Sequence, residues 1–278
     1  MITPVTLEAR NLPLILCGSP RRGNSLRAAE LAAGVIGAGW PRGAELLELR
    51  GRMLRPCIDC GACARAEGKF PAYPGALCPL DGGASRPASV NARVGKKEGT
   101  PEAGQRGTAA GPCAQGPAVI APGLDSQSPP PPGEREGGNG IDECGEIFRR
   151  FLEAPFVLLT APIYFYHLPA QLKGLLDRSQ LFWQAGLQGV KAAPAAPRNA
   201  WCILLGAREQ GEKLFEGSLL TLKYALEPFG LKLREPLTLY GLEQAGDLAG
   251  NPEAGQKILN YAARILEAER AFAAQGGD

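Results

Sequence analysis

The stretch "LPLILCGSPRRGNS", residues 12–25, joins a short apolar segment to a polar loop that contains two glycines. The apolar residues 12–18 are typical of a buried strand, and residues 24–38 have the pattern of an amphipathic helix. Asn24 and Ser25 are residue types that commonly cap the first turn of a helix. The stretch therefore predicts a strand, a tight loop and a helix in direct succession, with Asn24 or Ser25 as the N-cap.

The alternation of strand and helix continues along the chain. Apolar or mixed segments predict four further strands, at residues 44–50, 155–164, 200–207 and 231–241. Amphipathic segments predict four further helices, at residues 142–154, 168–183, 212–230 and 252–275. Apolar strands that alternate with helices are typical of a parallel sheet covered on both faces. The sequence thus predicts an α/β fold with a doubly wound, five-stranded parallel sheet, which binds ligands at the carboxyl ends of its strands.

Residues 82–140 differ in composition from the rest of the chain. They contain no aromatic residue and are rich in Gly, Pro, Ala and Ser. Such a segment cannot bury enough apolar surface to offset its chain entropy, so we expect it to be disordered. A linker between two domains fits less well, because residues 1–81 hold too few strands for a sheet of their own. We therefore expect a single domain, residues 1–278, with a long disordered insertion.

Charge and composition limit the class of protein. The 278 residues carry a formal net charge of only +2, so neither nucleic acid nor a membrane surface is an expected partner. The N-terminus lacks the basic region of a signal peptide, and no apolar run approaches the roughly 20 residues of a membrane span. We expect a cytoplasmic protein, where disulfides are rare. Its eight cysteines then indicate metal binding or redox chemistry.

The loop at residues 18–25 is suited to an anion. Its place between a strand and a helix directs backbone N–H groups and the positive end of the helix at a bound group. Arg21 and Arg22 add positive charge, and a phosphomonoester fits these features. The loop matches neither the Walker A pattern nor G-x-G-x-x-G. The alternative is a tight, capped loop whose two arginines are merely solvated.

Two segments resemble a known family. The loop "GSPRRGNS" (18–25) resembles the FMN-phosphate loop of the NADPH-dependent FMN reductase family, which has the flavodoxin-like fold. The segment "APFVLLTAPIYFYHLPAQLKGLLDR" (154–178) resembles a second motif of that family, with Lys173, Asp177 and Arg178 at matching positions. The resemblance implies an FMN phosphate bound by Ser19, Pro20, Arg21, Arg22, Asn24, Ser25 and Leu26. It also implies a wall beside the flavin ring formed by Pro162, Ile163, Tyr164 and Phe165.

Other roles remain open for the aromatic residues of this second motif. The alternative for Tyr164 and Phe165 is that their side chains simply pack at the end of the sheet. His167 is the only histidine of the chain and follows them closely. It is as compatible with a surface position as with a contact to flavin or substrate, so we assign it no catalytic role.

Four cysteines crowd the stretch "RPCIDCGACARAEGKFPAYPGALCPLD", residues 55–81. Three are spaced C-x2-C-x2-C, and the fourth follows after 14 residues. Four thiolates are the number that a [4Fe–4S] cluster needs, whereas structural zinc or cysteines without metal are the alternatives. The pattern resembles the iron–sulfur flavoprotein subgroup of the family, although the usual final gap there is about half as long. This resemblance implies a cluster bound by Cys57, Cys60, Cys63 and Cys78.

These features predict an FMN-dependent oxidoreductase with a [4Fe–4S] cluster. It would transfer electrons between NAD(P)H or a protein donor and a small acceptor such as a quinone. The cofactors perform the redox chemistry, so no catalytic side chain is required. The alternatives are an FMN or quinone reductase whose cysteines bind nothing, a flavodoxin-like electron carrier without NAD(P)H turnover, and a scaffold that acts through its insertion. The family resemblance implies a homodimer or homotetramer.

Overall fold

The structure of the chain, a computed structural model, describes residues 12–66, 78, 142–194 and 196–275. All of these residues belong to one compact unit. The insertion expected at residues 82–140 lies outside the described residues, so its disorder and the single-domain organisation stay predictions.

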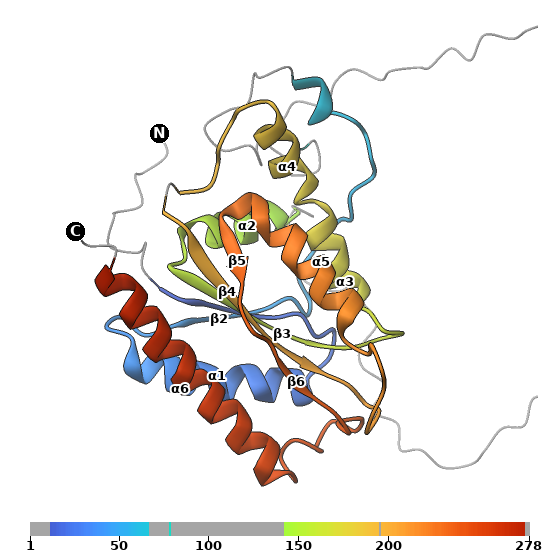
Figure 1. Cartoon of the computed structure of the whole chain (residues 1–278). Helices are drawn as coiled ribbons and strands as arrows, with labels where there is room; N and C mark the ends of the chain where they lie inside the picture. Colours follow the sequence, from blue (N-terminus) through green and yellow to red (C-terminus); the bar gives the residue numbers. More distant parts are fainter. Residues whose placement is uncertain (1–11, 67–77, 79–141, 195, 276–278) are drawn as a thin grey trace, which may run out of the picture. The chain divides into compact units, whose positions relative to one another are not determined.

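A parallel sheet lies at the centre of the described unit (Figure 1). Strand β1 (Leu14–Cys17) pairs with β2 (Glu45–Glu48) on one side and with β3 (Phe156–Pro162) on the other. Beyond β3 lies β4 (Arg198–Leu205), and the strand order is β2-β1-β3-β4-β5. This is the order of the flavodoxin-like doubly wound sheet, so the predicted fold class is confirmed.

The last position of the sheet is shared by two short strands. Both β5 (Leu231–Leu233) and β6 (Leu237–Leu239) pair in parallel with β4, β5 near its start and β6 near its end. Pro236, which has no N–H to donate to a strand ladder, lies in the interval between them. The prediction of one strand over 231–241 is therefore wrong in this detail, and the described sheet has six strands instead of five.

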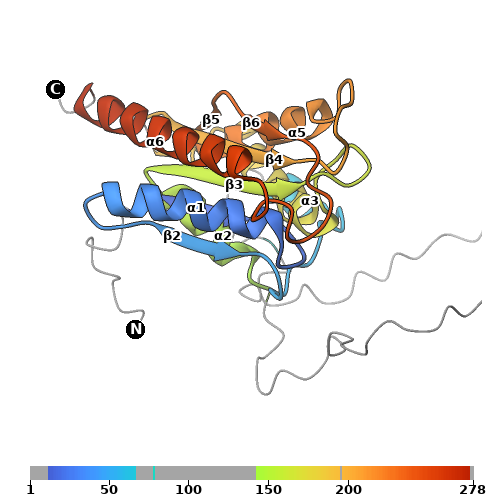
Figure 2. The same cartoon turned by 90° about the horizontal axis from the view of Figure 1, so that it is seen from below.

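Helices cover both faces of the sheet (Figures 1 and 2). One face packs against α1 (Asn24–Gly39) and α6 (Pro252–Gln275), which lie side by side. The other face packs against α2 (Cys144–Glu153), α3 (Ala170–Asp177), α4 (Gln180–Leu187) and α5 (Glu216–Leu226). Because successive strand residues point to opposite faces, the alternating side chains of each strand contribute to two separate hydrophobic cores. Cys17 and Cys202 are buried core residues.

The predicted helix at 168–183 is interrupted at Arg178 and Ser179. The backbone N–H of Arg178 donates to the carbonyl of Leu175, three residues earlier, which tightens the end of α3. The Arg178 side chain is buried and forms an ion pair with Asp142, which is buried as well. Its guanidinium also donates to the carbonyl oxygen of Arg55, at 3.4 Å. This arginine therefore links α3 to the residues before α2 and to the start of the cysteine-rich stretch.

A second buried arginine, Arg198 at the start of β4, binds the ends of two helices. Its guanidinium donates to the carbonyl oxygens of Phe151, Leu152 and Ala154 at the end of α2, at 2.9, 2.9 and 2.6 Å. It also donates to the carbonyl of Phe229, the last residue of the short 3-10 helix Glu227–Phe229 that follows α5. Burial lowers the pKa of Arg198 to about 10, so the group stays charged at neutral pH. A positive charge at helix carboxyl ends is stabilising, since their last carbonyls lack partners within the helix.

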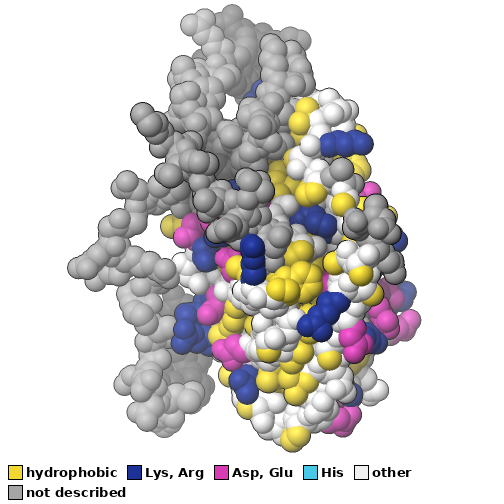
Figure 3. Space-filling model, turned by 90° about the vertical axis from the view of Figure 1, so that its left-hand side faces the viewer, with side chains coloured by type: hydrophobic (Ala, Val, Ile, Leu, Met, Phe, Trp, Pro, Cys, Tyr) yellow, Lys and Arg dark blue, Asp and Glu magenta, His cyan; other side chains and the backbone are white. Residues whose placement is uncertain are grey.

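The surface of the described unit carries charges of both signs. On the side of the molecule that Figure 3 shows, acidic and basic side chains are interspersed among hydrophobic ones. Within the described ranges, no helix combines the length and the apolar character needed to cross a membrane.

Candidate functional site

The loop after β1 and the turn after β3 lie next to each other at the carboxyl edge of the sheet. Cys17 of β1 pairs with Thr160 of β3, so the residues that follow each strand emerge side by side. The Gly18 N–H donates to the Thr160 carbonyl at 2.8 Å, and the Thr160 hydroxyl donates to the Ser25 carbonyl at 3.0 Å. After β1 the chain continues to β2 at one edge of the sheet, whereas after β3 it continues to β4 and towards the other edge. Open α/β sheets bind their ligands at such a switch in strand order.

The amino terminus of α1 is open to an anion. The N-cap is Gly23, with no side-chain cap, so the expectation of a cap by Asn24 or Ser25 is wrong. The first turn of α1 holds no acidic residue that would compete with an anion for its N–H groups. The Ser25 hydroxyl lies in this turn on a side chain that is 3% exposed, and it has no hydrogen-bond partner among the described residues.

Ser19 and Asn24 organise the loop through their side chains. The Ser19 hydroxyl donates to the Arg21 carbonyl at 2.7 Å and accepts a hydrogen bond from the Arg21 N–H at 3.3 Å. The Asn24 amide donates to the Gln244 carbonyl at 2.7 Å and accepts from the Leu248 N–H at 3.1 Å. These side chains hold the loop in shape and against the segment before α6, which leaves mainly the backbone N–H groups of the loop for a bound anion.

The remaining loop residues divide into exposed and buried positions. Pro20, Arg21 and Arg22 are exposed, whereas Leu26 packs in the core between the sheet and α1. Arg21 donates to the carbonyl of Glu243 at 3.3 Å. Arg22 has no ion pair with any residue that the structure describes, so it is the cation of the loop that a bound anion could recruit.

Gly18 is required by close packing where β1 ends. A Cβ atom at this position would lie 2.5 Å from Cδ2 of Leu172 in α3. A larger residue would therefore require the Leu172 side chain, or the helix that carries it, to shift.

The turn after β3 has an unusual backbone. Tyr164 and His167 exchange two backbone hydrogen bonds, of 2.8 and 2.9 Å, across the two intervening residues. Those residues, Phe165 and Tyr166, have φ values of 49° and 65°. Positive φ at both central positions defines a type I′ turn, which favours Asn and Gly and strains bulky residues. The Phe165 side chain is 102% exposed, so packing within the described residues does not explain this strain. Strained backbone of this kind clusters at functional sites.

Neighbouring side chains fix the rest of the turn. The Nδ1 atom of His167 accepts from the Leu168 N–H at 2.9 Å, which places the ring proton on Nε2 in the neutral tautomer. That Nε2 lies 3.1 Å from the Thr221 hydroxyl of α5 and donates to it. Arg208 donates to the Tyr166 hydroxyl at 3.1 Å, and its guanidinium lies 5.4 Å from the centre of the ring. His167 thus helps to hold the turn in place.

Arg208 belongs to a third loop that the sequence interpretation missed. This loop follows β4, and the hydrogen bond from the Ile163 N–H to the Leu205 carbonyl, at 2.8 Å, places it beside the turn after β3. A signal for it is present in the sequence. Gly206 and Gly211 have the same spacing after β4 that Gly18 and Gly23 have after β1.

The four predicted cluster ligands do not converge in the described structure. Cys57 and Cys60 are exposed, whereas Cys63 and Cys78 are half-buried. Within the described residues, which include all four cysteines, no three or more His, Cys, Asp or Glu side chains gather closely enough to hold a metal ion. Burial raises the pKa of the Cys63 thiol, and the nearby thiols of Cys57 and Cys60 raise it further. The described residues therefore give no support for the predicted cluster.

Cys78 nevertheless has a defined place. Its sulfur accepts a hydrogen bond from the guanidinium of Arg178 at 3.3 Å, and that arginine is paired with Asp142. The guanidinium of Arg178 therefore donates both to the sulfur of this distant fourth cysteine and to the carbonyl oxygen of Arg55, at the start of the cysteine-rich stretch.

Comparisons with known proteins agree with the fold. No protein-family model matches the chain, and no curated protein matches it. A flavone reductase matches in structure with a TM-score of 0.50 at 9% identity, over 94% of this chain and 64% of the flavone reductase chain. An NAD(P)H:quinone oxidoreductase from Methanothermobacter marburgensis has a TM-score of 0.49 at 14% identity, with 92% and 94% of the two chains covered. An azoreductase from Bacillus anthracis str. Sterne has a TM-score of 0.47 at 12% identity, with 92% of this chain and 98% of the azoreductase chain covered.

We expect the strain at Phe165 to be measurable. Replacing Phe165 with Asn, which tolerates positive φ, should raise the free energy of unfolding by about 1 kcal/mol. The matched variant Phe165→Ala lacks the short polar side chain that lets Asn tolerate positive φ, so it should give no such gain. Urea unfolding of the three proteins tests this, and equal stability of the Asn and Ala variants would show that the turn is not strained.

The likeness at such low identity concerns the fold alone. The flavone reductase match and the strand order of the sheet together show that this chain has the flavodoxin-like fold.

Proposed function

We propose that this chain is an FMN-dependent oxidoreductase that transfers electrons between NAD(P)H, or a protein donor, and a small acceptor such as a quinone. One observation carries the proposal. The uncapped amino terminus of α1 and a strained, exposed aromatic turn lie side by side at the switch in strand order. The first feature suits a phosphate group, and the second suits a flat apolar ring.

The phosphate of FMN fits the loop after β1. Its ligands would be the backbone N–H groups of the first turn of α1, the Ser25 hydroxyl and the guanidinium of Arg22. The hydrogen bonds of Ser19 and Asn24 hold these groups in place before any ligand binds. Such preorganisation reduces the entropy that binding would otherwise cost.

The ring of FMN fits the turn after β3. Pro162 ends the strand and Ile163 follows it, and the exposed rings of Tyr164 and Phe165 supply an apolar wall beside them. Bound flavin would supply the hydride and electron chemistry, as cofactors do in such enzymes. The chain's own residues would bind and orient it, and Arg208 would hold Tyr166 at the rim of the site.

A flavone reductase shares this fold, but at 9% identity the likeness shows the fold alone and does not assign the activity. Its chain is longer than this one, which spans 64% of it, so the activity is proposed here on the site's geometry.

The [4Fe–4S] cluster stays a prediction of the cysteine spacing. Cys57, Cys60, Cys63 and Cys78 would have to come together to bind it, and we derive no step of the reaction from it. The proposal for FMN does not depend on the cluster, because the flavin residues belong to other loops.

We expect the protein to bind FMN more tightly than riboflavin, which lacks the phosphate. In Ser25→Ala, the FMN affinity should fall about ten-fold through loss of a hydrogen bond to a charged group, while the riboflavin affinity stays the same. Fluorescence titration measures both. Equal affinity of the wild-type protein for the two flavins would contradict the phosphate site.

The same preparations separate an enzyme from an electron carrier. With FMN bound, an enzyme oxidises NAD(P)H in the presence of a quinone, and this turnover should fall in Ser25→Ala when FMN is not saturating. Tight FMN binding without turnover would instead support the flavodoxin-like electron carrier.

A further inference from the structure

A groove of about 470 Å³ lies between α5 and the pair α3 and α4. Its volume falls in the range of pockets that hold small molecules. The described residues that line it come from these helices, from Ser179 between α3 and α4, and from Pro228 just after α5. None of them belongs to the loop after β1 or to the turn after β3, so this groove is distinct from the candidate flavin site.

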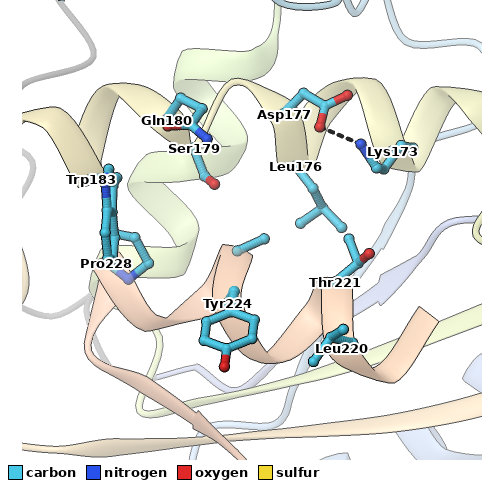
Figure 4. A pocket seen from close by; sticks show the side chains of 11 residues that line it. Lys173, Leu176, Asp177, Ser179, Gln180, Trp183, Leu220, Thr221, Tyr224 and Pro228 are labelled. Atoms are coloured by element: carbon cyan, nitrogen blue, oxygen red, sulfur yellow. Dashed lines mark hydrogen bonds and ion pairs between the residues drawn. The ribbon is translucent and has the colours of Figure 1, made fainter. Parts of the chain in front are cut away.

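One wall of the groove carries a buried hydroxyl group. Ser179 occupies the N-cap position of α4 and is only 5% exposed. An N-cap serine usually accepts a hydrogen bond from the first turn of its helix, but Ser179 has helical backbone angles and makes no such bond. Its hydroxyl has no hydrogen-bond partner among the described residues and points into the groove (Figure 4). A buried hydroxyl without a partner costs free energy, which a bound ligand would recover.

The end of the groove at α4 is suited to a flat ring. Trp183 of α4 and Pro228 stand together there, and Tyr224 of α5 lies on the facing wall (Figure 4). Both aromatic rings are exposed. Exposed aromatic rings supply large flat surfaces on which the ring of a ligand can stack.

The end of the groove at α3 carries one charge of each sign. Lys173 and Asp177, four residues apart on α3, form an ion pair there (Figure 4). Among the described lining residues these two alone are charged, whereas Lys223 and Glu227 line the groove on the other side of α5. A purely anionic ligand would be repelled by Asp177, and a purely cationic one by Lys173. A ligand that carries both charges is complementary to this end.

We propose that this groove binds a small aromatic zwitterion, of which a free aromatic amino acid is the simplest example. Its ring would stack on Trp183 and Pro228. At the other end, its carboxylate would bind Lys173 and the Ser179 hydroxyl, and its ammonium group would bind Asp177. Hydrogen bonds to charged groups are stronger than those between neutral groups, so the serine and the ion pair would provide the selectivity. The site would act independently of the flavin.

Three matched compounds test the class of ligand. Isothermal titration calorimetry of the full-length protein with L-phenylalanine should show binding at one site. Phenethylamine lacks the carboxylate and 3-phenylpropionate lacks the ammonium group. Each should bind at least about ten-fold more weakly, because each loses hydrogen bonds between charged groups. Equal affinity for the three compounds would overturn the assignment of a zwitterion.

Variants of the lining residues test the location. In Trp183→Ala and in Ser179→Ala, the affinity for L-phenylalanine should fall at least about five-fold, through loss of the stacked ring and of the hydroxyl. Leu187→Ala removes an exposed side chain of α4 that does not line this groove, so it should leave the affinity within about two-fold of the wild type. Circular dichroism verifies that each variant is folded.

Two results would overturn the proposal. One is the absence of binding of L-phenylalanine to the wild-type protein at millimolar concentration, both in calorimetry and in saturation-transfer NMR. The other is full affinity in the Trp183→Ala and Ser179→Ala variants. Because these titrations need no flavin, their failure is distinguishable from failure of the proposed function.

Discussion

The pairing of β1 with β3 is the constraint on which the candidate site depends. The two strands are separated by more than a hundred residues of sequence, yet Cys17 lies opposite Thr160 in the sheet. This register brings the loop after one strand and the turn after the other to the same edge. The Thr160 side chain strengthens the connection by binding the first turn of α1. Without that pairing, the loop after β1 and the aromatic turn after β3 would be unrelated surface features.

Around this edge, most polar side chains support the backbone. Asn24 binds the segment before α6, and His167 binds α5. A site built this way presents fixed backbone groups and exposed rings, which suits a cofactor that brings its own reactivity.

The sequence predicts the order of strands and helices well, because apolar runs and helical periodicity are local signals. It predicts less well where a distant partner decides the structure. The break between α3 and α4 contains Arg178, whose partner Asp142 is 36 residues away. Asn24 is a plausible cap by residue type, but its amide binds the backbone of Gln244 and Leu248. The place of Arg208 against Tyr166 likewise depends on neighbouring strands, and no local pattern predicts it.

A crystal structure of the protein grown with FMN would test the central claim most directly. We expect the phosphate to lie at the amino terminus of α1, within hydrogen-bond distance of backbone N–H groups between Ser19 and Leu26. We also expect the isoalloxazine ring to lie against Tyr164 and Phe165. A flavin bound elsewhere on the chain, or an amino terminus of α1 that stays empty at saturating FMN, would contradict this claim.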